Sequence, residues 1–445
     1  MVLRGHGHKR VKQCMVGTLS AVALLGVAAV PAHAESARSQ QWHLNAMDAD
    51  EMWKVSKGEG VTVAVIDTGV NSSISDLKGQ VLPGKDFTGL PGGPLEDYGD
   101  HGTMMAALVA ATGKAGTAKG TYGLAPDAKI LPLRMDDENE DAANAAEADR
   151  QFASTLAAAI RYAANSEAKV LNISMATESR STEVQKAVDY ALAKGKLIFA
   201  GVGNSGKKEN PVMYPAAIPG VVGVSAIDKK VLATDESEKG AQVDLAAPGD
   251  EIVASCDGGS ELCRGHGTSA ATALASASAA LIWSKHPGWT ANQVTRVLVN
   301  TAGRPKSGAE RNDFIGYGVV RPRVALKDPG SPGDPKTNPL PGPYNEDDAK
   351  AAAREKAGEK AEGDRSETSA SKGEDGISVP AVVGMGVAAA VVLGAAVAVP
   401  VVVRRRRAAQ PTSPPAGPYA YSGPPQWQDS PPPPQRHPDD RHQRP

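Results

Sequence analysis

Four side chains in the first two thirds of the chain carry the functional groups that a serine-type hydrolase needs. Asp67, His101, Asn204 and Ser269 supply a carboxylate, an imidazole, an amide and a hydroxyl. In such chemistry the imidazole takes the hydroxyl proton, the carboxylate orients the imidazole, and N–H donors stabilise the oxyanion. The sequence therefore offers one candidate for each role.

Asp67 and His101 lie where strands and helices are expected to begin or end. Asp67 follows a β-branched run, 61–66, that predicts a buried parallel strand. Ligand crevices in open α/β sheets lie at the carboxyl edge of the strands, so this carboxylate is well placed, although a turn or cap aspartate gives the same pattern. His101 precedes an apolar helix that opens at Gly102 and Thr103. A surface histidine near a helix cap is the alternative there.

Ser269 and Asn204 supply the hydroxyl and an amide donor. Ser269 begins an Ala-rich helix that runs to Ser284, and a backbone N–H at a helix start is free and favours nearby negative charge. Asn204 lies in a Gly-rich turn after an expected strand, where ordinary turn chemistry is the alternative. His266, three residues before Ser269, is a rival base. Its loop offers no obvious partner to orient it, so we prefer His101.

The elements that must position these residues alternate along the chain. Five strand-like runs are separated by helix-like stretches that include 145–164 and 184–194. This rhythm predicts an α/β fold with a parallel sheet and helices on both faces. The expected strands are 61–66, 128–133, 170–174, 197–202 and 220–226.

The motifs around the four residues are similar to those of the subtilisin-like serine proteases. Asp67–Gly69, His101–Thr103 and Gly267–Ser269 match that family's D-T-G, H-G-T and G-T-S motifs, in the family's chain order. The resemblance covers about residues 42–328. It implies an acyl-enzyme on Ser269, and an oxyanion held by Asn204 and the Ser269 backbone N–H.

The resemblance also implies where a substrate binds. Ser174, Met175 and Ala176 look like the edge segment that pairs with an extended peptide and lines the first specificity pocket. Ala176 stands where many relatives carry glycine, which narrows that pocket. Many relatives bind calcium, but no acidic loop here has the spacing of a site. We therefore expect no cofactor and leave calcium open.

Composition and the N-terminal segment indicate an exported protein. The net charge of −2 leaves no large basic field, which excludes a nucleic-acid partner. Residues 1–34 combine basic residues, an apolar run and an A-x-A site at 32–34, which predicts a signal peptide. Outside that segment only Cys256 and Cys263 remain. They predict a disulfide in an exported chain and two free thiols in a cytosolic one.

The C-terminal third predicts a membrane tether. Residues 35–328 are expected to form the protease domain, and 329–379, first Pro/Gly-rich and then charged, a flexible spacer. The span is expected at 380–403, because its 23 uncharged residues from 381 form a helix of about 35 Å, enough for a hydrocarbon core of about 30 Å. Arg404–Arg407 place the Pro-rich tail, 404–445, in the cytoplasm. The protease domain is then extracellular on a single-pass cell-membrane protein.

This layout resembles the mycosins, the subtilisin-like proteases of actinobacterial type VII secretion systems. The resemblance implies an endopeptidase that processes exported proteins, with the secretion complex as a partner. Two other functions stay open. One is a structural subunit that stabilises a membrane secretion complex, and the other is a general surface protease.

Overall fold

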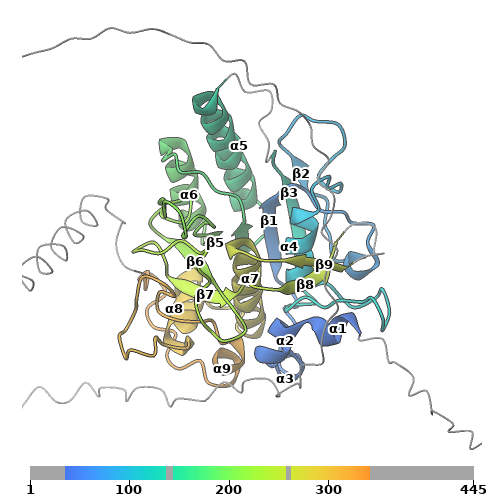
Figure 1. The fold of residues 1–445 in the computed structure, drawn as a ribbon, viewed down its shortest axis with the longest axis vertical. Coiled ribbons are helices and arrows are strands. Elements are labelled where there is room, and N and C mark those ends of the chain that lie inside the picture. The colour runs from blue at the N-terminus through green and yellow to red at the C-terminus, as the bar shows by residue number, and fades with distance from the viewer. Residues whose placement is uncertain (1–35, 137–143, 257–261, 341–445) are drawn as a thin grey trace, which may run out of the picture. The chain divides into compact units, whose positions relative to one another are not determined.

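A parallel β-sheet forms the centre of the fold. The computed structural model describes residues 36–136, 144–256 and 262–340, and in these ranges seven strands form one sheet of order β2-β3-β1-β4-β5-β6-β7 (Figure 1). Every neighbouring pair in it is parallel. The strands are β1 (Thr62–Asp67), β2 (Lys85–Asp86), β3 (Lys129–Arg134), β4 (Val170–Ile173), β5 (Leu197–Gly201), β6 (Val221–Ile227) and β7 (Leu245–Pro248).

The order of the strands places a topological switch point beside β1. Strands β2 and β3 lie on one side of β1, and β4 to β7 lie on the other. The chain crosses over β1 when it passes from β3 to β4, and a ligand crevice forms at the carboxyl ends of strands at such a switch point. Asp67, the last residue of β1, lies there.

Alternate residues of the strands face two different apolar layers. Val63 and Val65 of β1 belong to one buried cluster, whereas Ala64 and Ile66 belong to the other. This period of two is what a strand buried on both faces produces. It explains why the expected strands read as continuous apolar runs.

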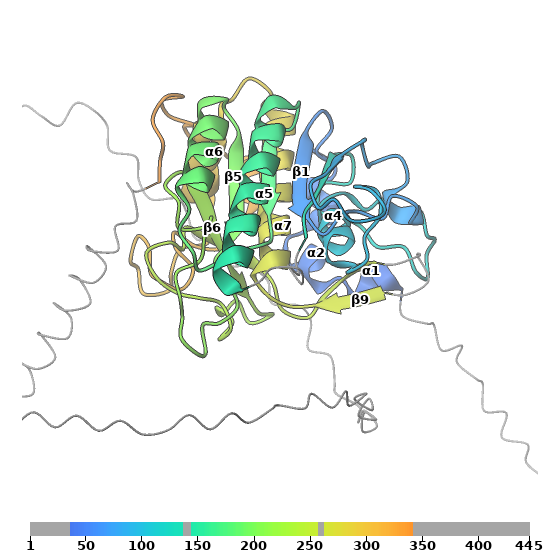
Figure 2. The same cartoon turned by 90° about the horizontal axis from the view of Figure 1, so that it is seen from above.

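Helices cover both faces, as the sequence predicts (Figure 2). α5 (Ala145–Asn165) and α6 (Thr182–Ala193) pack on one face, and the buried residues of α5 recur at helical spacing. α4 (His101–Ala110) and α7 (Thr268–Lys285) pack on the other. Nearly all residues of α7 are buried, because small side chains let it lie against the sheet on one side and α4 on the other.

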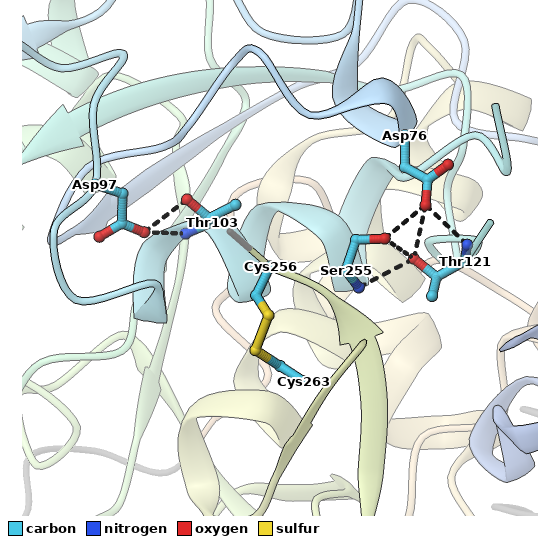
Figure 3. The surroundings of a disulfide bond; sticks show 7 residues. All are labelled: Asp76, Asp97, Thr103, Thr121, Ser255, Cys256 and Cys263. Atoms are coloured by element: carbon cyan, nitrogen blue, oxygen red, sulfur yellow. Dashed lines mark hydrogen bonds between the residues drawn. A yellow bond between two sulfur atoms is a disulfide. The ribbon is translucent and has the colours of Figure 1, made fainter. Parts of the chain in front are cut away.

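The remaining elements complete the layer that contains α7. An antiparallel hairpin of β8 and β9 is closed by the predicted disulfide between Cys256 and Cys263, whose Cα atoms are 5.7 Å apart (Figure 3). Its second strand leads directly into α7. These elements are α1 (Ala37–Gln40), α2 (Trp42–Ala46), α3 (Ala49–Met52), η1 (Ser75–Leu77), β8 (Ile252–Ser255), β9 (Leu262–Gly265), α8 (Ala291–Thr301) and α9 (Pro322–Lys327).

The ordered domain extends beyond its expected end at residue 328. The carbonyl of Pro335 accepts hydrogen bonds from Thr290 and Asn292, and Leu340 packs against the core. Residues 333–337 therefore contact α8, although they lie within the range predicted as a flexible spacer. Sequence reasoning missed this because the stabilising partners belong to α8, not to the Pro/Gly-rich segment itself.

Several sequence predictions lie outside the described residues. These are the signal peptide at 1–34, the spacer from 341 onward, the span at 380–403 and the tail at 404–445. In the described ranges, no helix combines the length and apolar character needed to cross a membrane.

Candidate active site

A buried carboxylate orients the imidazole of His101. Nδ1 of His101, the first residue of α4, lies 2.7 Å from Oδ1 of Asp67 at the end of β1, and the Asp67 side chain is 0% exposed. A carboxylate is an acceptor, so Nδ1 carries the hydrogen and Nε2 is left as the basic nitrogen. The structure thus brings together two of the four predicted residues in the geometry of a general base.

Gly102 allows α4 to approach β1 this closely. A Cβ atom at this position would lie 2.1 Å from the carbonyl oxygen of Gly69 and 3.1 Å from Cβ of Asp67. Any other residue would push the helix away from the strand. The glycine in the H-G-T motif is therefore required by the close approach of the two elements.

Asp97 is a second carboxylate beside this pair, and sequence reasoning missed it. Its Oδ2 accepts hydrogen bonds from the backbone N–H and the hydroxyl of Thr103, at 2.7 and 2.6 Å (Figure 3). Its Oδ1 accepts one from the Thr68 hydroxyl, at 2.8 Å. Thr68 in turn accepts from Gly102 N–H. Asp97 therefore ties the start of α4 to the turn that follows Asp67; its position shortly before a helix start was the available signal.

Ser269 lies in the first turn of α7, beside the end of β4. Its Oγ donates to the carbonyl oxygen of Ser174 at 3.3 Å, and Ser174 Oγ donates to the Ser269 carbonyl at 3.4 Å. Because α7 begins at Thr268, the Ser269 N–H is one of the free donors of the helix N-terminus. The predicted nucleophile and the predicted substrate segment are thus adjacent.

Asn204 is anchored through its side-chain oxygen. Oδ1 accepts from the Thr268 N–H at 2.9 Å and from the Thr268 hydroxyl at 3.2 Å. This network assigns the oxygen and leaves the NH2 group as the donor end of the amide. A Cβ at Gly267 would lie 3.0 Å from that oxygen, and Gly267 has φ +114, so a glycine is needed beside it.

The predicted substrate segment is fixed on its far side. Thr177 forms two backbone hydrogen bonds with Tyr214, of 3.0 and 2.8 Å. Met175 packs against the apolar cluster that includes α5 and α6, so its side chain contributes to that core. Ser174 and Ala176 flank it as the remaining candidates for contact with a peptide.

Comparison with known proteins supports this site. Residues 58–318, more than half of the chain, match the model of the subtilase family, Peptidase S8. The chain belongs to the subtilase family. The expected subtilisin-like family and α/β fold are therefore confirmed.

The relatives of this subtilase include a thermophilic serine proteinase, subtilisins and a mycosin. It is 37% identical to the thermophilic serine proteinase of Bacillus sp. over 47% of this chain and 49% of the relative, so the match spans only about half of that protein. It is 32% identical to Mycosin-1 of Mycobacterium tuberculosis over 68% of this chain and 76% of the relative. The crystal structure of MycP1 from Mycobacterium smegmatis is similar, with a TM-score of 0.58 and 28% identity over 68% and 87% of the two chains.

His266, the rival base, does have a partner in this subtilase. Its Nδ1 lies 2.8 Å from an oxygen of Glu236, contrary to the expectation that its loop offers no orienting group. Sequence reasoning missed the pair because Glu236 is thirty residues away. The His266 and Glu236 side chains are 70% and 23% exposed, whereas those of His101 and Asp67 are 38% and 0% exposed. His101, whose orienting carboxylate is fully buried, remains the better base.

The described part of the subtilase contains no group of three or more His, Cys, Asp or Glu side chains arranged to hold a metal ion. One buried acidic residue, Asp76, has its oxygens bound by donors of the protein itself. It accepts from the N–H groups of Ala115 and Thr121 and from the Ser255 hydroxyl, at 2.7, 2.8 and 2.5 Å (Figure 3). These bonds give Asp76 a structural role, since it links η1 to β8.

Proposed function

We propose that this subtilase hydrolyses peptide bonds with Ser269 as nucleophile and His101 as general base. The observation that carries the proposal is the Asp67–His101 pair at the carboxyl edge of β1, where α4 begins and where the Asp67 carboxylate is fully buried. Oγ of Ser269 bonds to the scissile carbonyl carbon while His101 takes its proton. The C–N bond then breaks and His101 gives the proton to the leaving amine. Water then attacks the acyl-enzyme in the same way, with His101 again taking and returning a proton, which releases the carboxylic acid and restores Ser269.

Two N–H groups can donate hydrogen bonds to the oxyanion in this mechanism. They are the NH2 group of Asn204, oriented by Thr268, and the Ser269 N–H at the start of α7. Both are fixed before substrate binds, which is what makes such donors effective. Each step uses a group of the chain itself, and we propose that no cofactor takes part.

For attack, the Ser269 hydroxyl gives its proton to Nε2 of His101 and gives up its hydrogen bond to the Ser174 carbonyl. That hydrogen bond is 3.3 Å long, so only one weak interaction is lost. Ser174 and Ala176 then serve the extended substrate, with Ala176 narrowing the first pocket. A peptide with a small residue before the cut fits that arrangement best.

We further propose that the enzyme is tethered outside the cell membrane and processes proteins exported by a type VII secretion system. Its relatives include Mycosin-1, and one similar structure, MycP1, is described as an essential component of the type VII (ESX-1) secretion system. The expected signal peptide, single span and cytoplasmic Arg404–Arg407 support that location.

Active-site labelling tests the catalytic proposal. The full-length protein and its Ser269→Ala variant are treated with a fluorophosphonate probe. Removing such a nucleophile lowers turnover by about 10⁶, so label should appear on the parent and not on the variant. A folded parent that takes no label contradicts the protease proposal and favours the structural-subunit function.

Complementation separates the three candidate functions in cells. Cells that lack the gene receive either the wild-type chain or the Ser269→Ala chain, and exported small helical proteins are then measured. If both chains restore export but only the wild-type chain cleaves the exported substrate, the result supports processing within the secretion system. If both chains restore export and neither cleaves the substrate, the result supports the structural subunit. Unchanged export in the deletion strain supports a general surface protease.

A further inference from the structure

A buried carboxyl group lies directly beneath the turn that carries Asn204. The Glu238 side chain belongs to the segment between β6 and β7, and the residue is 1% exposed. Gly203 lies on top of this carboxyl: a Cβ there would be 2.5 Å from the carboxyl carbon and from both oxygens. Gly203 also has φ +107, so the turn has the shape that only a glycine adopts readily.

Hydrogen bonds connect the turn to the same segment at several points. Ser205 N–H donates to Oε1 of Glu238 at 3.3 Å, and Glu238 N–H donates to the Gly203 carbonyl at 3.2 Å. Gly206 N–H donates to the Glu236 carbonyl at 2.9 Å. The segment therefore contacts the residues on either side of Asn204.

The opposite side of the turn is held by the start of α7. Thr268 donates twice to Oδ1 of Asn204 and accepts from Gly203 N–H at 3.3 Å. The turn that carries Asn204 is thus held between Thr268, which precedes the nucleophile, and the Glu238 carboxyl group. A shift of that carboxyl would move the amide relative to Ser269.

We propose that Glu238 is a positioning residue whose buried carboxyl group holds the 203–206 turn so that the amide of Asn204 faces the oxyanion. This inference rests on the proposed protease function and deepens it. Glu238 does not touch the reacting atoms and acts only through the turn.

The charge of this carboxyl then matters to the reaction. Burial raises the pKa of Glu238 to about 7, and the negative charge of Glu178 raises it further, while the hydrogen bond from Ser205 acts in the opposite direction. Among the described residues, Oε2 has no hydrogen-bond partner. The nearby Glu236 is paired with His266, which leaves the Glu238 carboxyl without a cation of its own in these ranges. The neutral form fits this environment better than the anion.

Ionisation of Glu238 should slow catalysis. Above about pH 7 a buried negative charge develops below the turn whose amide must stabilise another negative charge. The rate is expected to rise on the acid side as the base becomes available, and then to fall as Glu238 loses its proton. If only the neutral form reacts, the fall approaches about tenfold per pH unit.

The test compares pH profiles for the full-length protein and its Glu238→Gln variant. The second-order rate of reaction with a fluorophosphonate probe is measured from pH 5 to pH 9. Gln keeps the acceptor for Ser205 and cannot ionise, so the falling limb should disappear while the rate at pH 6 stays similar. Glu236→Gln is the matched control, because it removes a carboxylate two residues away that points to His266, and it should keep the falling limb.

A second comparison tests whether Glu238 acts through Asn204. In an Asn204→Ala background the rate should be lower at every pH, and its falling limb should shrink, whether or not Glu238→Gln folds well. A limb that persists unchanged in Glu238→Gln, or unchanged in Asn204→Ala, overturns the inference. A parent that takes no label at any pH overturns the proposed function and this inference together.

Discussion

Asn204 has an acceptor and a donor, and the structure assigns them to different tasks. The oxygen is bound by Thr268, while the NH2 group is left for the oxyanion. Asn204→Ala should therefore lower kcat by about 10²–10³ and leave KM nearly unchanged, because the donor is used mainly in the transition state. Steady-state kinetics on a peptide substrate measures this, with the exposed Asn45→Ala as control. A rise in KM at constant kcat would instead mean that Asn204 binds the ground state.

Asp97 illustrates a residue that acts on the base without being one of the catalytic residues Asp67, His101 and Ser269. It accepts from Thr103 at the start of α4 and from Thr68 next to Asp67. Asp97→Ala should lower the free energy of unfolding by about 1–2 kcal/mol, as the loss of a helix cap does, and should lower kcat as well. Asp97→Asn, which retains one acceptor oxygen, should recover part of both. Equal loss of kcat in the two variants would show that charge, and not the cap, is what matters.

At the scale of the elements, the contact between β6 and β7 contains a buried acid. Asp244 lies next to β7, and its Oδ2 accepts from Gly223 of β6 at 3.0 Å. Burial raises the pKa of Asp244 to about 7, against the attraction of Arg311. The folded pKa lies above the unfolded value of 3.8, so this group's contribution is complete below about pH 4 and is lost as the pH rises through 7.

Asp244→Asn should remove that loss. The variant should gain stability relative to the parent as the pH rises from 5 to 8, by up to a few kcal/mol. Urea unfolding at several pH values measures the difference. The control is Asp313→Asn, because Asp313 is half exposed and approaches the same Arg311. A difference between parent and Asp244→Asn that does not change with pH would contradict the buried neutral acid.

The hairpin of β8 and β9 depends on a covalent link that the sequence predicts. Cys256 and Cys263 close a short loop immediately before the strand that leads to α7. Replacing both with Ser should lower the free energy of unfolding by about 2–3 kcal/mol, from the loop entropy returned to the unfolded chain. Thermal unfolding of the oxidised parent, the reduced parent and the double variant measures this. A reduced parent as stable as the oxidised one would contradict it.

How far the sequence predicts these elements depends on whether the signal is local. The runs at 61–66 and 197–202 lie within a residue of β1 and β5, because continuous apolar residues specify buried strands. The hairpin of β8 and β9 was not predicted, since its pairing joins segments separated by a loop. The carboxylates of Glu236 and Glu238 were missed for the same reason. Their importance comes from His266 and the Asn204 turn, which are distant in sequence.

At the scale of the whole molecule, the residue at which the catalytic domain ends is also the residue at which the expected spacer to the membrane begins. The Pro/Gly-rich composition after residue 328 predicts a flexible chain, yet residues 333–337 bond to α8 through backbone carbonyls. Such a segment has few apolar side chains of its own, so its order comes from the donors that α8 presents. Composition alone does not reveal those donors.

A chain that ends at residue 328 should therefore be less stable than one that ends at 340. It loses the acceptors for Thr290, Asn292, Gln293 and Arg296, and the packing of Leu340. Exposed hydrogen bonds contribute about 0.5–1.5 kcal/mol each at most, so we expect a loss of about 2–3 kcal/mol and a lower Tm. Thermal unfolding of the two chains measures it. Gln293→Ala in the longer chain should lower the Tm by part of the difference between the two chains, because it removes the bond to Gly333. In the shorter chain the same substitution should remove only the capping bond with Thr290 and have a smaller effect. Equal Tm values for the two chains would mean that residues 329–340 do not stabilise the catalytic domain, which would then end at residue 328.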